Sequence, residues 1–219
     1  MERRSTTWPV DQAAAVALQR ELAPRVVHAW SGQQVRLVAG IDISANDRTG
    51  LARAAVVALT YPELEVVETR THEEPLRFPY VPGLLSFREA PSILEAFDTL
   101  QCRPDLLLVD GQGIAHPRGL GIAAHLGVLL DCPSIGCAKS RLVGQHQQVG
   151  ETPGDRAELI YRGQVVGVAL RTKARTNPLY ISIGHRIDLP TAVDYVLACC
   201  RGYRLPEPTR RAHLASGSR

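Results

Sequence analysis

Apolar and polar residues along the first third of the chain predict one helix followed by three strands. Between Asp11 and Val27 the apolar residues recur at helical spacing, and an Asp stands at the start of the segment. Three strand-like runs follow, beginning at Val35, Leu51 and Leu64. Because only short connectors separate these runs, we expect them to form an antiparallel meander.

Beyond the meander, helical and strand-like patterns alternate. In chain order these segments are a helix near 91–100, the strand DLLLVD, a helix near 119–130, the strands PSIGCA, GQVVGVALRT and PLYISI, and helices near 191–200 and 208–215. Alternation of helices with buried strands is typical of parallel sheets covered by helices. We therefore predict an α/β fold of the ribonuclease H-like class, with a mixed central sheet in which the three-stranded antiparallel meander is extended by parallel strands and flanked by helices.

The chain has the organisation expected of a single domain over residues 1–219, since no internal repeat or low-complexity linker interrupts its 219 residues. A helical region is expected at about 1–30 and a disordered tail at about 216–219. The N-terminus is charged and then polar, which argues against a secretory signal. No apolar run approaches the roughly 20 residues that span a bilayer, so no membrane association is expected.

Cysteine usage indicates a reducing compartment. The five cysteines are an odd number and form no CxxC pair, which argues against a disulfide framework and against a zinc site. These features predict a cytoplasmic protein, and nothing in the sequence indicates an obligate protein partner.

The net charge of +3 is too small to identify a nucleic-acid-binding protein by itself, but its distribution is uneven. Basic residues gather after position 139: Lys139, Arg141, Arg171, Lys173, Arg175, Arg186, Arg201, Arg204, Arg210 and Arg211. Such a run is expected of a surface that binds the phosphate backbone of a nucleic acid. It is equally expected of a basic surface that only contacts solvent.

Two aspartates stand in apolar strand segments. Period-two alternation in LVAGIDIS puts Asp42 on the strand face that also carries Val38 and Gly40, and Asp110 ends DLLLVD. A buried carboxylate needs a cation, a salt bridge or a hydrogen-bond cap. The alternative for Asp110 is an Asp-Gly turn, but here Asp-Gly opens a long glycine-rich segment. Pairing of these two strands at the sheet centre would bring Asp42 and Asp110 together.

Glu89 has two interpretations on local evidence. Ser86 and Glu89 have capping-box spacing, whereas Pro91 favours a helix that begins later and leaves Glu89 exposed just before it. Three carboxylates without a Cys or His pair favour a hard cation, Mg²⁺ or Mn²⁺. Such a cation polarises a phosphate and activates water.

Three segments resemble the motifs of the endonuclease V family: FPYVPGLLSFREAP, LLLVDGQGIAHPRGLGIAAHLGVLLDCPSIGCAKSRLVG and GYRLPEPTR. The similarity extends over nearly the whole chain from AGIDIS onward. It implies a ribonuclease H-like fold and a Mg²⁺-dependent endonuclease, with Mn²⁺ able to substitute. The expected partner is DNA containing deoxyinosine or another deaminated base. The expected reaction is hydrolysis of the second phosphodiester bond 3′ of the lesion, leaving 3′-hydroxyl and 5′-phosphate ends.

The resemblance also implies roles for individual residues. Asp42 and Asp110 would bind the metal ion, and Glu89 would be the third acid of the site, directly or through water. Lys139 would stabilise charge near the scissile phosphate or orient the water. His213 is the least secure member, because the family varies there, and taken alone it reads as a surface residue.

The remaining motif residues would recognise the base. Pro79, Tyr80, Val81 and Pro82 resemble a rigid wedge that fills the gap left by an extruded base. Without the resemblance to the family, the same four residues would be interpreted as a proline-rich connector whose tyrosine packs against the protein. The extruded base would enter a pocket made by Gly83, Leu85, Gly111, Gly121, Ile122 and Leu142, in which glycines allow close backbone approach. Phosphate contacts are expected from His116 and Ser140.

Three motif positions call for comment. His125 falls inside a predicted helix and is interpreted as structural, and Cys137 is interpreted as a small core residue that replaces a commoner Val. Gln112 departs from the His that many relatives carry, which puts fine metal or substrate detail in doubt. Alternatives to the DNA endonuclease are an inosine-specific endoribonuclease, a non-catalytic binder of deaminated bases, and a glycosylase.

Overall fold

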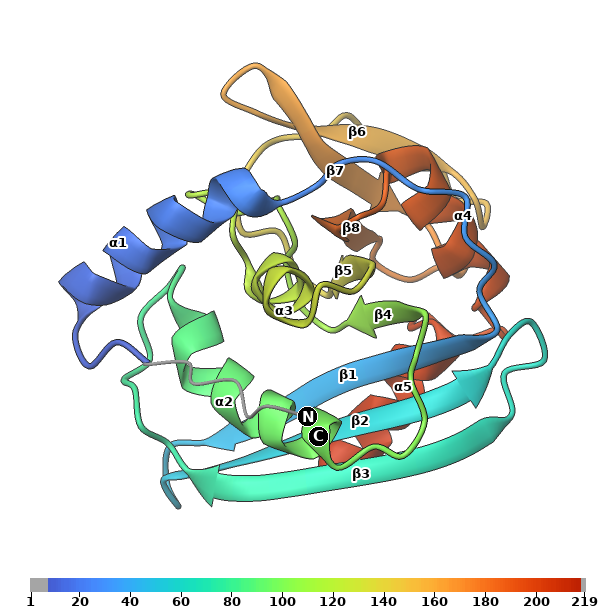
Figure 1. Cartoon of the computed structure of the whole chain (residues 1–219). Helices are drawn as coiled ribbons and strands as arrows, with labels where there is room; N and C mark the ends of the chain where they lie inside the picture. The colour runs from blue at the N-terminus through green and yellow to red at the C-terminus, as the bar shows by residue number, and fades with distance from the viewer. Residues whose placement is uncertain (1–7, 218–219) are drawn as a thin grey trace.

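The computed structural model describes residues 8–217, and in this range the strands form one mixed sheet (Figure 1). The helices are α1 (Gln12–Leu22), the 3₁₀ turn η1 (Ala23–Arg25), α2 (Leu85–Asp98), α3 (Ile122–Leu130), α4 (Leu189–Ala198) and α5 (Glu207–Ser216). The strands are β1 (Leu37–Asn46), β2 (Leu51–Thr60), β3 (Val66–Pro75), β4 (Leu106–Val109), β5 (Ser134–Ala138), β6 (Arg156–Tyr161), β7 (Gln164–Leu170) and β8 (Leu179–His185).

The strand order is β3-β2-β1-β4-β5-β8-β7-β6. The predicted antiparallel meander is present as β1, β2 and β3, and β4 and β5 extend it in parallel. The outer three strands, whose direction the sequence left open, are antiparallel: β8 is antiparallel to β5, and β7 and β6 continue as antiparallel neighbours. The sheet is therefore mixed as expected, with a parallel part limited to its centre.

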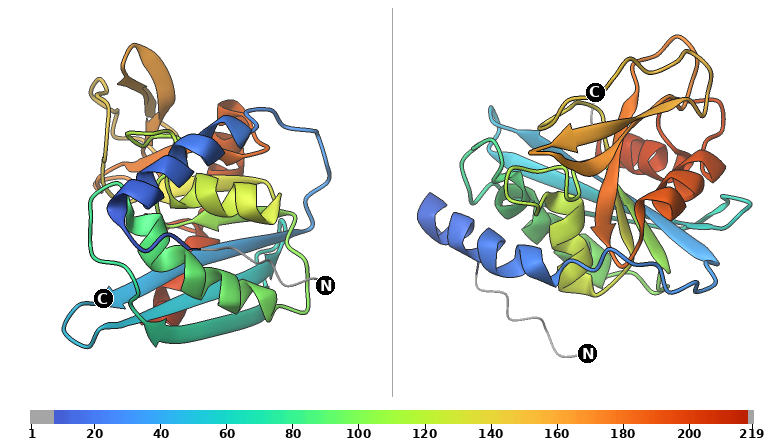
Figure 2. Two further views of the ribbon diagram at one scale, coloured as in Figure 1. Left: turned by 60° about the vertical axis from the view of Figure 1, so that its left-hand side comes forward. Right: turned by 90° about the horizontal axis from the view of Figure 1, so that it is seen from above.

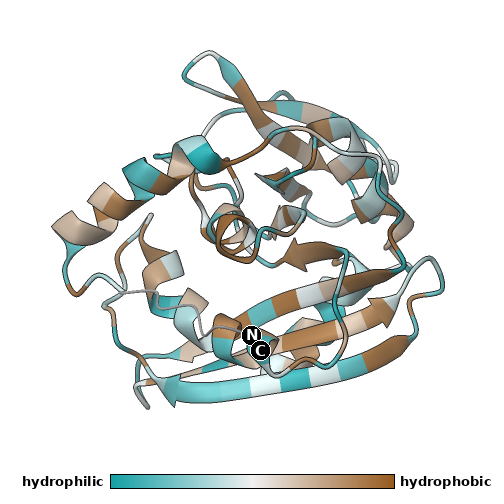
Figure 3. Cartoon of the chain, viewed as in Figure 1, coloured by the Kyte–Doolittle hydropathy of each residue, from teal (hydrophilic) through white to brown (hydrophobic). Residues whose placement is uncertain are grey.

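Helices cover both faces of the sheet (Figures 1 and 2). On one face Ala39 and Ile41 of β1 pack with residues of α2 and α3, and on the other Val38 packs in a cluster that includes residues of α4 and α5. The central strand β4 is buried and apolar along its length, whereas the edge strand β3 is largely hydrophilic (Figure 3). This burial on both faces explains why β4 reads as a continuous apolar run.

Helix α5 lies unusually close to β1. A Cβ at Gly40 would stand 1.9 Å from the carbonyl oxygen of Pro208, so only glycine permits this approach. The helix also continues through Ser216, which is buried, instead of giving way to the disordered tail expected from about 216. Residues 218–219 of that predicted tail, and residues 1–7 of the predicted N-terminal helical region, lie outside the described range.

Helix α2 begins earlier than either interpretation of Glu89 required. It starts at Leu85 with Leu84 as its N-cap, and no side chain caps it, so Ser86 and Glu89 form no capping box. Pro91 lies inside the helix and not at its start. Burial of Ile93 and Phe97 against the sheet, and of Phe87 in the cluster with Phe78 and Ala15, outweighs the hydrogen bond that a proline removes. Among the helices of residues 8–217, none combines the length and apolarity needed to cross a membrane.

Candidate active site

The two strand aspartates meet at the centre of the sheet. In the parallel pair β1–β4, Ile41 is opposite Val109, and the backbone N–H of Asp110 donates a 2.9 Å hydrogen bond to the carbonyl of Ile41. Asp42 is only 6 % exposed, and the Asp110 side chain is similarly buried. Strand pairing thus places both carboxylates side by side in a poorly solvated position, as the sequence predicted.

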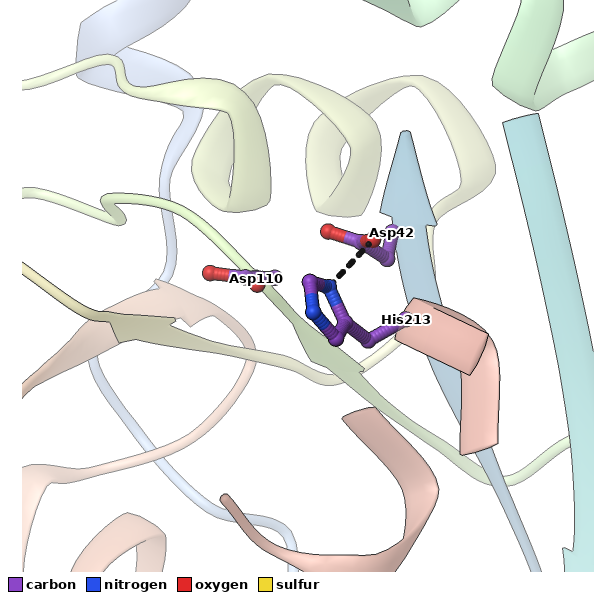
Figure 4. Close-up of side chains that lie close together, drawn as sticks. All are labelled: Asp42, Asp110 and His213. Atoms are coloured by element: carbon purple, nitrogen blue, oxygen red, sulfur yellow. Dashed lines mark hydrogen bonds and ion pairs between the residues drawn. The ribbon is translucent and has the colours of Figure 1, made fainter. Parts of the chain in front are cut away.

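A histidine from the C-terminal helix completes a three-residue group (Figure 4). One potential ligand atom from each of Asp42, Asp110 and His213 lies within 4.8 Å of the others. His213 Nδ1 is 3.2 Å from Asp42 Oδ2, and the Ser216 hydroxyl donates a 2.8 Å hydrogen bond to the same oxygen. His213 is therefore part of this group and not the isolated surface residue that its sequence position alone suggested.

Lys139 follows β5 and extends over the same group. Its Nζ forms an ion pair with Asp110 Oδ2 at 2.5 Å and lies 3.2 Å from His213 Nδ1. Burial and then the charge of Asp42 raise the pKa of Asp110 to about 6, while Lys139 opposes the rise. Lys139 thus supplies positive charge beside the buried carboxylates.

The donor set fits a hard divalent cation. Two carboxylates and one imidazole nitrogen offer ligand atoms that all lie within 4.8 Å of one another. Oxygen-rich donor sets suit Mg²⁺ or Mn²⁺. Asp42, Asp110 and His213 are therefore the residues that could hold such an ion.

Glu89 reaches this site from α2 and is half-buried. Burial raises its pKa to about 7; Arg88 acts against the rise, and the charges of Asp42 and Asp110 add to it. Arg88 is itself buried and forms an ion pair with Asp47 in the turn after β1. The influence of both aspartates on the pKa of Glu89 indicates that the three acids belong to one electrostatic unit.

A cavity of about 400 Å³ opens beside the carboxylates. It is lined by Asp42, Glu89, Asp110 and Lys139 together with all six predicted base-pocket residues: Gly83, Leu85, Gly111, Gly121, Ile122 and Leu142. At Gly121 a Cβ would stand 2.3 Å from the Gln112 carbonyl oxygen, so the glycine is required for the loop to fold over this wall. The structure therefore joins the acidic group to a pocket with backbone-lined walls.

The four predicted wedge residues differ in how far they are exposed to solvent. Tyr80 is 63 % exposed and lines the cavity together with Pro82, so it is not the packed tyrosine of the alternative interpretation. Pro79 is exposed beside it, whereas Val81 packs against an apolar cluster that contains Phe78. An exposed aromatic ring thus stands at the mouth of the cavity, anchored by its neighbour.

The two predicted phosphate contacts have different surroundings. Ser140 is exposed, and its carbonyl accepts a 2.8 Å hydrogen bond from Gln112 Nε2. His116 is buried, with Nε2 2.9 Å from the Gly83 carbonyl oxygen and Nδ1 accepting from the backbone N–H of Arg118. Both ring nitrogens are engaged inside the protein, so His116 supports the pocket wall, and His116 also lines the cavity. The phosphate contacts of His116 and Ser140 stay predictions.

The two residues interpreted as structural lie in the interior. The ring of His125 packs against Trp8 and Phe87, with centroid separations of 5.7 and 5.2 Å. Cys137 is fully buried in the core cluster on the α4 and α5 face.

Much of the basic run after position 139 is held by the protein itself. Arg201 and Arg204 donate to backbone carbonyls, and Arg210 and Arg211 both pair with Glu207 at 2.6 Å. Exposed basic side chains include Arg141, Lys173 and Arg175. The run therefore serves partly to fix the C-terminal loops, and only part of it faces solvent.

Sequence reasoning missed two side chains that act on the site. Ser216, in the last turn of α5, was assigned to a disordered tail, although the helical spacing after Pro208 continues through it. Gln19 of α1 is 1 % exposed and donates hydrogen bonds to carbonyls of both walls of the cavity. No local pattern distinguishes a buried glutamine of this kind.

Comparison with known proteins identifies relatives over almost the full chain. The family model described as Endonuclease V matches residues 20–214. An endonuclease V of Gloeobacter violaceus is 52 % identical over 210 residues, which cover 94 % of this chain and 85 % of that protein. The crystal structure of endonuclease V from Streptomyces avermitilis has a TM-score of 0.91 at 42 % identity, covering 96 % of this chain and 93 % of that one. Endonuclease V of Ciona intestinalis, solved with a 24mer DNA containing an inosine followed by a ribo-adenosine, has a TM-score of 0.85 at 29 % identity, covering 94 % and 95 %.

Proposed function

Because the chain belongs to the endonuclease V family, we propose that it is a Mg²⁺-dependent endonuclease that recognises deaminated bases in DNA, chiefly deoxyinosine. It hydrolyses the second phosphodiester bond 3′ of the lesion and leaves 3′-hydroxyl and 5′-phosphate ends. The observation that carries the proposal is the joining of the carboxylate–histidine group to a backbone-lined cavity with Tyr80 at its mouth. Cleavage chemistry and base recognition thus share one site.

Asp42, Asp110 and His213 would hold the metal ion, with Glu89 as the further acid, directly or through water. A Mg²⁺ ion, or Mn²⁺ in its place, supplies Lewis-acid polarisation of the phosphate and a more acidic water. Ser216 and the backbone of β1 hold Asp42 in position, so that the carboxylates do not have to be ordered again at each turnover.

Lys139 provides the mobile positive charge of the site. In this structure its ammonium group neutralises Asp110, at 2.5 Å. When cations share the carboxylates, the ammonium is free to interact with the phosphate and to stabilise the negative charge that develops during hydrolysis. Half-exposure of Lys139 allows this movement.

Base recognition uses the cavity. Tyr80 fills the space left in the duplex by the extruded base, and a deaminated base in a weak pair is extruded at lower cost. Backbone groups in the glycine-lined walls of the cavity read the edge of hypoxanthine, and adenine leaves some of those groups unpaired. Leu142 supplies an apolar wall.

The proposal is tested by separating cleavage from binding on one duplex that contains a single deoxyinosine. Asp110→Asn should abolish cleavage in Mg²⁺ while lesion binding survives, because the change removes a metal ligand and leaves the cavity walls intact. Loss of both would indicate that Asp110 is structural, and binding without cleavage by the unmodified protein would indicate a non-catalytic binder.

The second candidate is an endoribonuclease for inosine in RNA. It is favoured by the Ciona relative, whose DNA ligand carries a ribo-adenosine after the inosine. Cleavage rates on matched DNA and RNA strands, each with one inosine, distinguish the two candidates. Faster cleavage of the RNA strand would favour the second.

A further inference from the structure

We propose that Gln19 of α1 is a positioning residue that clamps the two walls of the base pocket together and thereby sets discrimination between hypoxanthine and adenine. The inference rests on the proposed function of that cavity. Gln19 lies just before the segment matched by the family model and does not line the cavity itself. It acts through the carbonyls behind each wall.

The side-chain amide of Gln19 joins two loops that are distant in the sequence. Its Nε2 donates to the Gly83 carbonyl at 3.0 Å and to the Leu120 carbonyl at 3.2 Å. Gly83 belongs to the loop that carries Tyr80, and Leu120 precedes Gly121 in the opposite wall. One NH₂ group therefore ties the wedge loop to the glycine-rich loop.

The remaining atoms of the amide are satisfied as well. Arg118 Nε donates to Gln19 Oε1, and Arg118 Nη2 donates to the Gly83 carbonyl at 2.6 Å. His116 Nε2 is 2.9 Å from the same carbonyl. Burial lowers the pKa of His116 to about 4, so near neutral pH the ring is neutral and donates from Nε2. Three side chains thus converge on the carbonyl of Gly83.

The chemistry of the site requires an amide. The two carbonyl oxygens need donors, and the guanidinium of Arg118 needs an acceptor on the opposite side. A carboxylate would direct an oxygen towards two carbonyls. An apolar side chain of the same length would leave the Leu120 carbonyl and Arg118 Nε without their Gln19 partner, while the Gly83 carbonyl would keep only Arg118 and His116. Gln19 is 1 % exposed, so water cannot take its place without rearrangement.

Helix α1 is held against the rest of the molecule by apolar contacts that do not depend on the amide. Leu22 packs with Leu120, Ala124 and Val128, which holds the C-terminal end of α1 against α3 (Figure 2). Loss of the amide should therefore leave α1 docked while the two loops move relative to each other. Because a pocket that reads a base by hydrogen bonds depends on the spacing of its walls, the consequence falls on discrimination.

The test compares Gln19→Met and Gln19→Glu with Asp11→Ala. Asp11 caps α1 by accepting a 2.8 Å hydrogen bond from the backbone of Ala14, so its loss weakens the same helix without touching the pocket. Cleavage of a deoxyinosine duplex and of the matched adenine duplex is measured at saturating Mg²⁺. The Gln19 variants should lose about tenfold or more in the ratio of kcat/KM values, mainly through KM for the lesion. The Mg²⁺ concentration for half-maximal activity should not change.

An unchanged ratio in folded Gln19→Met, or an equal fall in Asp11→Ala, would overturn the proposal. If the Gln19 variants do not fold, Arg118→Met provides the test. Arg118 lies in a half-exposed loop, and its replacement removes the hydrogen bonds to Gln19 and Gly83, so the ratio of kcat/KM values should fall by the same factor. Amide hydrogen exchange at residues 83–85 and 119–122 provides a readout independent of cleavage. It should accelerate in the clamp variants and not in Asp11→Ala, so failure of the clamp and failure of the proposed function are distinguishable.

Discussion

Ser216 Oγ donates a 2.8 Å hydrogen bond to Asp42 Oδ2, the oxygen that also lies 3.2 Å from His213 Nδ1. Ser216 and His213 both come from the last turns of α5, and Asp42 comes from the middle of β1. The close approach of α5 at Gly40 brings the two elements together. The C-terminal helix therefore orients the central carboxylate of the site.

Replacement of Ser216 by Ala should weaken metal binding more than it weakens substrate binding. Asp42 loses a fixed hydrogen-bond donor, and removal of such a supporting contact typically costs about tenfold or more in metal affinity. The measurement is the Mg²⁺ concentration for half-maximal cleavage. Leu214→Ala, at an exposed position of the same helix, serves as control and should leave that concentration unchanged. Equal behaviour of the two variants would count against the role of Ser216.

Acidification should increase the metal requirement of the enzyme. Burial and the charge of Asp42 raise the pKa of Asp110 to about 6, so below this pH a proton occupies the carboxylate that a cation must bind. Mg²⁺ titrations of cleavage at pH 5.5, 6.5 and 7.5 should show the half-maximal concentration rising towards low pH. A half-maximal concentration independent of pH across this range would contradict the assignment of Asp110 as a ligand.

The wedge assignment predicts a selective effect of Tyr80. Its ring is exposed at the mouth of the cavity, so Tyr80→Ala should leave stability and the Mg²⁺ requirement near their original values. Preference for the deoxyinosine duplex over undamaged duplex should fall by roughly tenfold, which corresponds to the loss of one stacking contact. Tyr80→Phe keeps the ring and should retain the preference. Unchanged preference in Tyr80→Ala would exclude a wedge role.

His125 should make the fold sensitive to acid. Both ring nitrogens are buried without a hydrogen-bond partner among the described residues, and burial lowers the pKa to about 4 from an ordinary value of 6.5. Between these values the unfolded chain binds the proton and the folded protein does not, so stability is lost as the pH falls through this window, by about 3 kcal/mol in full. His125→Phe should remove this part of the loss.

Urea unfolding at pH 7.5 and pH 4.5 measures the effect. The difference in unfolding free energy between the two pH values should be smaller in His125→Phe than in the unmodified protein. His28→Phe, at an exposed position, should leave the difference unchanged. An equal difference in all three proteins would mean that His125 finds a proton partner in the folded state.

The aspartate pair was predictable from sequence because its signal is local. An acid inside an apolar strand is costly, and the alternation around Asp42 and the apolar run before Asp110 identify both strands. The two aspartates then lie next to each other because β1 pairs with β4. The meander was predictable for the same reason, since short connectors leave few topologies.

Features that depend on distant contacts were not predictable in this way. The start of α2 is decided by burial of residues such as Phe87 and Ile93, which overrides the local signals of Ser86 and Pro91. Strand β6 was missed because it is short and only Leu159 among its six residues is buried. Gln19 bonds to partners 64 and 101 positions away, a separation that no sequence pattern reports.

The measurement that tests the central claim most directly is the mapping of product ends from a duplex with a single deoxyinosine, in Mg²⁺ and in EDTA. The proposed function predicts a nick at the second phosphodiester bond 3′ of the lesion, with 3′-hydroxyl and 5′-phosphate ends, in Mg²⁺ only. Release of free hypoxanthine without metal, or nicking that persists in EDTA, would contradict the assignment of Asp42, Asp110 and His213 as the metal site.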